Sequence, residues 1–131
     1  MDDSERLSSL RLFIGALARV LGNVNEVPFD PTSFATAVDN AQRENNAFAS
    51  RFAVYTTIAG RRCPDFLEGL TLAQSAGLIS RQNPNYTSFV LRMPTRQIRR
   101  LEAEQEFTDA EDLARHYLQL VGPDTETRAS A

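Results

Sequence analysis

Several residue types are scarce in this chain of 131 residues, and each scarcity narrows the range of possible functions. The one cysteine, Cys63, excludes a disulfide framework and a Cys-ligated zinc site. The one histidine, His116, argues against a multi-histidine metal site. The longest apolar run, residues 12–18, lies between two arginines and is too short to cross a membrane. We therefore expect no metal, no other cofactor and no membrane partner.

The composition is that of one ordinary globular domain. Apolar residues make up 42% of the chain and charged residues 24%, and the length suffices for a core that needs no disulfide. No internal repeat or linker divides the chain, so we expect a single domain over residues 1–122. Residues 123–131 are small and polar, which predicts a disordered tail. The acidic first residues are unlike a signal peptide, so we expect a cytoplasmic location.

Charge is unevenly distributed along the chain, although the net charge is only −3. Residues 51–100 carry eight arginines against two acids, a net of +6, whereas residues 1–50 carry −3 and residues 101–131 carry −6. Every basic residue is arginine, which suits planar, bidentate contacts with phosphate and guanine. Two interpretations follow. The basic middle forms a nucleic-acid surface, or its arginines pair with the acidic ends inside one fold.

Apolar residues at helical spacing predict a helix at each end of the domain. The first helix is expected over residues 4–21, with Ser4 as its cap and Gly22 as its end. For the last helix, Thr108 opens a capping box that predicts residues 108–121. The apolar stripe of the first helix is broad, so this helix packs either in a core or against a partner chain, and we expect a homodimer formed through the first and last helices.

Proline and glycine mark two helices in the middle of the chain. Asp30 and Pro31 predict an N-cap and a first helical residue, and the apolar stripe that follows fades near residue 44. Pro64 predicts the start of a further helix, and Gly77 predicts its end.

Residues 47–59 fit two kinds of structure. Their alanines favour a helix, which we prefer because strict alternation is missing, whereas their β-branched and aromatic residues favour a strand. We expect Phe48, Phe52 and Tyr55 to lie in the core.

Directly after the helix that begins at Pro64, the pattern changes to that of a β-hairpin. Residues 78–82 and 87–93 predict two strands, and the Asn-Pro-Asn sequence at residues 83–85 predicts the turn between them. Pro94 ends the hairpin, and Thr95 is expected to cap the basic helix that follows.

The step from helix to hairpin at Gly77-Leu78-Ile79 resembles the winged helix-turn-helix superfamily. The segment from Phe66-Leu67-Glu68-Gly69-Leu70 to Gly77-Leu78-Ile79-Ser80-Arg81 is similar to the last helix and the wing of those domains, and the likeness covers about residues 47–94. The resemblance implies a mainly α fold with a two-stranded β-hairpin wing, flanked by N- and C-terminal helices. It also implies that the helix before the hairpin is a recognition helix for double-stranded DNA.

The positions that match the DNA-contacting parts of winged helices are polar or basic. In such domains a helix N-terminus enters the major groove, while side chains of the wing reach phosphates or the minor groove. Asp65 and Glu68 lie on the helix that would enter the groove, where phosphates would repel them. The candidate DNA-binding residues that the resemblance implies are Arg61, Arg62, Thr71, Gln74, Ser75, Arg81, Asn83, Asn85, Tyr86 and Arg92. Arg96, Arg99 and Arg100 follow the second strand closely, and we expect them to extend this basic patch.

Two functions from different classes remain open. The first hypothesis is a dimeric, DNA-binding transcriptional regulator. The alternative is a winged-helix protein-interaction module (an adaptor, an antitoxin, or a phage or plasmid accessory factor) that does not bind nucleic acid, and the negative net charge favours it. No clustering of general bases or nucleophiles predicts an enzyme. Cys63 is expected to be a helix-cap or core thiol, and His116 a surface or interface residue.

Overall fold

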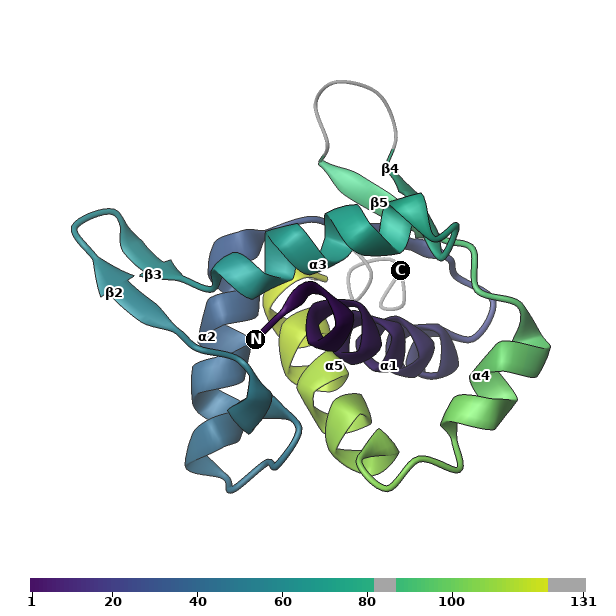
Figure 1. Ribbon diagram of the computed structural model, residues 1–131. Helices are drawn as coiled ribbons and strands as arrows, with labels where there is room; N and C mark the ends of the chain where they lie inside the picture. Colours follow the sequence, from purple (N-terminus) through teal and green to yellow (C-terminus); the bar gives the residue numbers. More distant parts are fainter. Residues whose placement is uncertain (82–86, 123–131) are drawn as a thin grey trace, which may run out of the picture.

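Helix α1 (Asp3–Leu21) runs through the centre of the molecule and contacts α3 (Pro64–Ser75), α4 (Thr95–Leu101) and α5 (Phe107–Val121) (Figure 1). The structure, a computed structural model, describes residues 1–81 and 87–122. The other elements of this part of the chain are β1 (Glu26–Pro28), α2 (Pro31–Arg43), the 3₁₀ turn η1 (Ala49–Arg51), β2 (Tyr55–Thr57), β3 (Gly60–Arg62), β4 (Ile79–Arg81) and β5 (Ser88–Leu91). The predicted combination of helices with an antiparallel hairpin is therefore confirmed.

Aromatic side chains from four helices meet in the core. Phe34 of α2 stacks on Phe66 of α3, with ring centroids 4.0 Å apart, and Phe13 of α1 meets Phe34 edge-on at 5.2 Å. Tyr117 of α5 is fully buried beside them. Contacts of this kind hold α1, α2, α3 and α5 together, because large aromatic rings bury more apolar area than any other side chain.

The apolar stripes of α1 and α5 pack against each other inside the chain. Leu10, Phe13 and Leu17 of α1, and Leu113 and Tyr117 of α5, are all completely buried. The apolar surface from which dimerisation was expected is therefore already covered within one chain, and a dimer through these two helices has no such surface to use.

The starts of α2 and α3 are as predicted. Asp30 caps α2, because its carboxylate accepts hydrogen bonds from the backbone N–H groups of Thr32 and Ser33, and Pro31 is the first helical residue. Pro64 likewise begins α3. Gly77 follows the end of α3 with a φ of +79°, a left-handed conformation that glycine adopts without strain.

Three predicted helix caps are wrong. The cap of α1 is Asp2, whose carboxylate accepts from the N–H of Glu5 at 2.8 Å, and Ser4 is already helical. Thr95 is the first residue of α4, after Pro94. Thr108 is the second residue of α5, because the first helical hydrogen bond runs from the N–H of Ala110 to the carbonyl of Glu106. In each case the helix begins one or two residues earlier than the predicted cap would place its first helical residue.

The predicted hairpin is confirmed as β4 and β5, in which Ile79 pairs with Leu91. Strand β1 was not predicted; it pairs with the other edge of β5 and completes a three-stranded antiparallel sheet in the order β1-β5-β4. A strand of three residues is too short to show alternation, and pairing with β5 is what makes it a strand. The predicted turn at residues 83–85 and the predicted tail at residues 123–131 lie outside the described residues.

The preferred helix over residues 47–59 is wrong. Phe48 and Phe52 are buried as expected, but they flank the short turn η1, and Tyr55 is 57% exposed on β2. The side-chain amide of Gln42 donates to the carbonyls of Ala49 and Phe52, so these two acceptors are satisfied without a helix. The chain then forms an antiparallel hairpin, β2–β3, that projects from the body (Figure 1). Within the described residues, no helix combines the length and the hydropathy that a membrane span requires.

Candidate nucleic-acid interface

Strand β4 joins the exposed polar face of α3 through Arg81. Its Nε donates to Oε1 of Gln74 at 2.7 Å, and its Nη2 donates to Oγ1 of Thr71 at 3.3 Å. Ser75, one residue after Gln74, is also exposed. The structure thus brings together four of the predicted DNA-binding residues, at the junction between the helix and the hairpin.

Arg92 immediately follows β5 and is exposed. Its backbone N–H donates to the carbonyl of Leu78, which fixes its place beside β4, and its Nε donates to Oγ of Ser80 at 3.2 Å. A hydroxyl partner leaves the positive charge of the guanidinium uncompensated, so Arg92 can still attract an anion.

Helix α4 presents three arginines, Arg96, Arg99 and Arg100, which are all exposed. Its apolar residues Ile98 and Leu101 are partly buried against the core, and Leu101 fills the space above Gly15 of α1. A hollow of about 340 Å³ is bordered by Pro94, Arg96, Gln97 and Arg100. Because the apolar side of α4 is fixed against α1, its basic side faces outward.

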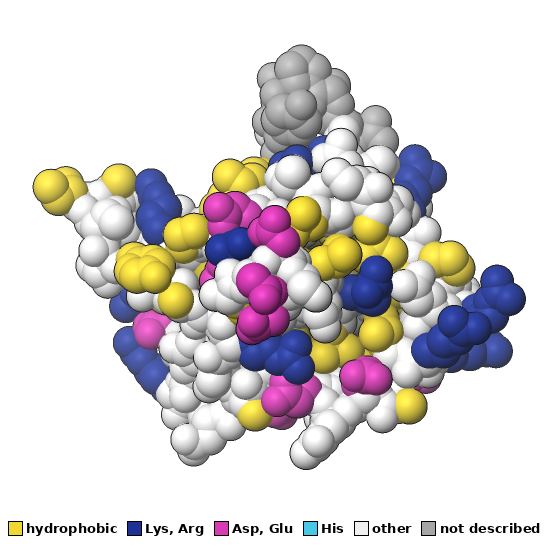
Figure 2. Space-filling model, in the orientation of Figure 1, with side chains coloured by type: hydrophobic (Ala, Val, Ile, Leu, Met, Phe, Trp, Pro, Cys, Tyr) yellow, Lys and Arg dark blue, Asp and Glu magenta, His cyan; other side chains and the backbone are white. Residues whose placement is uncertain are grey.

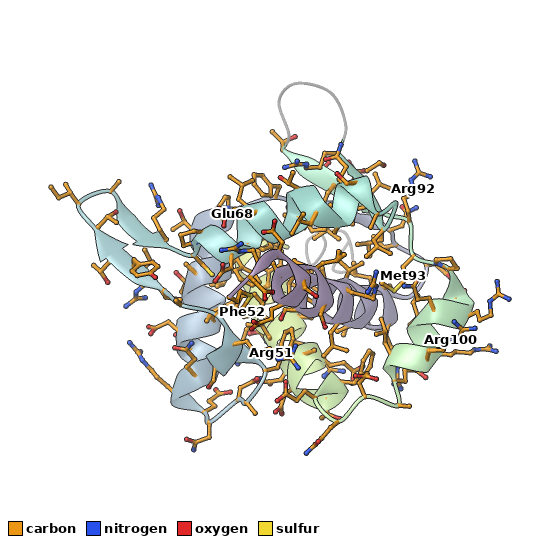
Figure 3. All side chains as sticks on the ribbon, viewed as in Figure 1. Arg51, Phe52, Glu68, Arg92, Met93 and Arg100 are labelled. Atoms are coloured by element: carbon orange, nitrogen blue, oxygen red, sulfur yellow. The ribbon has the colours of Figure 1, made fainter. Side chains whose placement is uncertain are left out.

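Arg92, which follows β5, and the arginines of α4 lie at the same end of the molecule. Dark blue side chains gather along the right-hand edge in Figure 2, over α4 and the region beside β5. Figure 3 shows Arg92 and Arg100 at this end and Arg51 at a distance from them. Met93, which directly follows Arg92 in the sequence, is buried. We call Arg81, Arg92, Arg96, Arg99 and Arg100 the basic end.

Carboxylates neutralise several of the other arginines. Arg51 contacts Glu106 at 2.8 Å and Arg61 contacts Asp39 at 3.4 Å, as expected if the basic middle pairs with the acidic flanks. In the described part of the chain, the ion pairs of arginine involve Arg6, Arg19, Arg43, Arg51 and Arg61. Arg92 and the three arginines of α4 form none with the described residues. The predicted pairing with the acidic flanks is therefore found for Arg51 and Arg61, whereas the basic charges of Arg92 and α4 lack such partners among the described residues.

Arg61 and Arg62 are separated from the basic end. They lie on β3, in the hairpin that precedes the N-terminus of α3, whereas β4–β5 follows its C-terminus (Figure 1). Arg62 donates from Nη1 to Oγ1 of Thr32 at 3.3 Å and to its neighbour's carbonyl. The predicted set of arginines is thus divided between the two ends of α3, and Asn83, Asn85 and Tyr86 lie outside the described residues.

The two acids of α3 are paired by a residue that the sequence did not single out. Arg6 of α1 contacts Oδ1 of Asp65 at 2.8 Å and Oε2 of Glu68 at 3.2 Å. The hydrogen bond that Arg6 donates to Asp65 is the main reason why the pKa of Arg6 is raised. The expected repulsion between these acids and a phosphate backbone is therefore reduced by a nearby positive charge. No sequence signal links Arg6 to Asp65, which is 59 positions away.

Cys63 precedes α3 and is buried. Burial raises the pKa of its thiol to about 12, despite hydrogen bonds from the backbone of α3 that act in the opposite direction. A thiol with so high a pKa has little thiolate at neutral pH, so the residue has the properties of a core thiol. A comparison of the chain with protein-family models, curated proteins and solved structures found no significant match.

Proposed function

We propose that this chain is a DNA-binding protein of the winged-helix kind with a role in transcriptional regulation, and that the basic end contacts the phosphate backbone. The observation that carries the proposal is the absence of any carboxylate from residues 69–101, a segment that contains five arginines. This segment forms the end of α3, the hairpin β4–β5 and the helix α4. Its charge is therefore concentrated in space as well as in sequence.

The contacts around α3 support a division of tasks within this surface. Phosphate contacts supply affinity and orientation, whereas side chains that reach base edges supply specificity. The arginines of α4 and Arg92 suit the first task, because they are exposed and have no carboxylate partner among the described residues. Gln74 suits the second, since its amide can pair with adenine in the major groove. Its contact with Arg81 holds it at the outer face of α3.

Salt dependence of binding tests the proposal. Each phosphate contact adds about 0.9 to the slope of log K against log salt concentration for duplex DNA. The variant Arg96→Ala/Arg99→Ala should therefore lower that slope by about 1.8 in fluorescence anisotropy with a labelled random duplex. A matched control, Arg43→Ala/Arg115→Ala, removes the same charge from two exposed arginines outside the basic end.

The expected result is a smaller slope for the first variant and a nearly unchanged slope for the control. Equal decreases of the slope in the two variants would show that binding depends only on the net charge of the protein. Absence of binding at low salt and at a protein concentration of about 10⁻⁴ M would contradict the proposal as a whole, because non-specific affinities for DNA lie at about 10⁻⁴–10⁻⁶ M at physiological salt.

The projecting hairpin β2–β3 favours a second candidate function, the protein-interaction module. All three residues of β2 are exposed, and Ile58 at the tip is fully exposed. An isolated two-stranded hairpin is only marginally stable in water, and its free edges can pair with a further strand. A partner that adds a strand here would be an adaptor target or a toxin rather than nucleic acid. If random duplex DNA does not bind, this hairpin becomes the leading candidate surface.

A further inference from the structure

Three side chains with metal-binding atoms meet between α2 and α5. Glu44 is the C-cap residue of α2, while Asp112 and His116 lie one turn apart on α5. The two helices pack against each other, which brings Glu44 and His116 together although they are 72 positions apart in sequence. His116 is the only histidine of the chain, and it lies here half-buried.

The ligand atoms are spaced as a small metal ion requires. Nε2 of His116 lies 3.1 Å from Oε1 of Glu44 and 3.7 Å from Oδ2 of Asp112. One such atom from each residue lies within 4.8 Å of the other two. Zinc binds nitrogen and oxygen at about 2.0–2.2 Å, so two ligand atoms of a tetrahedral site are about 3.4 Å apart. Small side-chain rotations would therefore bring all three atoms into coordination without movement of the helices.

Asn46 orients one of these ligands. Its side chain is buried, and its Nδ2 donates to Oδ2 of Asp112 at 3.1 Å and to the carbonyl of Asp109 at 2.8 Å. Its Oδ1 accepts from the N–H of Ala49 at 2.8 Å, so the amide is held on both sides. Hydrogen bonds of this kind orient the ligands of metal sites, and their loss commonly weakens binding.

We propose that Glu44, Asp112 and His116 bind a zinc ion, with the fourth coordination position taken by water. Two carboxylates and a neutral imidazole carry a charge of −2, which a divalent ion balances. The expectation of a metal-free protein rested on the lack of further histidines and cysteines, and a site with one histidine and two carboxylates does not need them. The ion would link the end of α2 to the middle of α5, at a different place from the basic end, so this proposal does not depend on DNA binding.

Zinc binding to the full chain, without an affinity tag, tests the site. Competition with a chromophoric chelator should show one zinc ion per chain. The variant His116→Gln should weaken binding by at least about 100-fold, and Glu44→Gln by at least about 10-fold, in line with the effects seen even for residues outside the coordination shell. The control Glu104→Gln removes an exposed carboxylate of the α4–α5 connection and should leave the affinity unchanged.

A second measurement does not depend on the folding of any variant. Because the chain has a single histidine, its imidazole proton resonances in NMR report on His116 alone. They should shift and saturate at one equivalent of zinc. Failure of zinc in large excess to shift them, or equal affinities of the wild type and His116→Gln, would overturn the proposal and leave His116 as a partner of acidic side chains only.

Discussion

The hydroxyl of Tyr117 offers a sharp test of how the fold is held together. It donates to the carbonyl of Pro28 at 2.6 Å and accepts from the backbone N–H of Asp30 at 3.1 Å. These two groups belong to the link between β1 and α2, and Asp30 is also the cap of α2. The buried hydroxyl oxygen of Tyr117 in α5 therefore fixes the position of the link between β1 and α2.

The substitution Tyr117→Phe removes this oxygen but keeps the ring. Phenylalanine preserves the edge-on contacts with Phe13 and Phe34 at 5.9 and 6.0 Å, so no large cavity forms. Two backbone groups lose their partner, and an unsatisfied buried polar group costs about 1–3 kcal/mol. Pro28 and Asp30 are only half-buried and can regain some hydration, so we expect the free energy of unfolding to fall by about 2 kcal/mol.

Urea denaturation followed by circular dichroism measures this loss. With a slope of about 1–3 kcal/mol per molar for a small protein, the midpoint should fall by about 1 M. The control is Tyr55→Phe, which removes the same atom from an exposed side chain and should change the stability by less than about 0.5 kcal/mol. An unchanged midpoint for Tyr117→Phe, or equal shifts in both variants, would refute the assigned role of the hydroxyl.

Two further predictions concern α3 and the residue before it. In Gly69→Ala the new Cβ would clash with Cδ2 of the fully buried Leu10, so we expect a loss of about 1–3 kcal/mol from overpacking, measured by thermal unfolding. A melting temperature equal to that of the wild type would show that α1 and α3 can separate freely. Burial of Cys63 raises the pKa of its thiol to about 12. A thiol-specific reagent at pH 8 should therefore react slowly with the folded protein and rapidly with the protein unfolded in urea. A fast reaction without urea would contradict this burial.

The parts of the fold that were predicted correctly depend on local chemistry. Asp30 and Pro31 mark the start of α2, Pro64 the start of α3, and Gly77 the end of α3. Each of these residues acts locally. A capping side chain forms hydrogen bonds with the first turn of its own helix, and a glycine ends a helix by adopting a left-handed conformation at that position. Such interactions can be read from a sequence without knowledge of the tertiary structure.

The parts that were missed depend on distant partners. Strand β1 exists through its pairing with β5, in which Val27 lies opposite Phe89. In place of the helix expected over residues 47–59, the chain forms a short turn whose Ala49 and Phe52 carbonyls accept hydrogen bonds from Gln42. Strand β5 lies far from β1 in the sequence, and Gln42 lies outside residues 47–59. The secondary-structure propensity of each segment alone therefore led to a wrong prediction.

The candidate DNA-binding surface shows the same limit. Its concentration of arginines was visible in the sequence, but the pairing of each arginine was not, since Arg51 meets Glu106 across 55 positions and Arg6 meets Asp65 across 59. These long-range ion pairs decide which arginines remain available. Among the candidate DNA-binding residues they pair Arg61, which lies with Arg62 on β3, so the candidate surface narrows to β4–β5 and α4.

A negative net charge is compatible with a basic end because electrostatic interactions in salt solution are short-ranged. The Debye length is about 10 Å at 0.1 M ionic strength, so an anion at α4 responds mainly to the charges within that distance. The packing of Leu101 over Gly15 is what fixes those charges in place, because it holds the apolar side of α4 against α1 and leaves Arg96, Arg99 and Arg100 exposed. Whether the chain attracts DNA therefore depends on this contact between two helices more than on the sum of its charges.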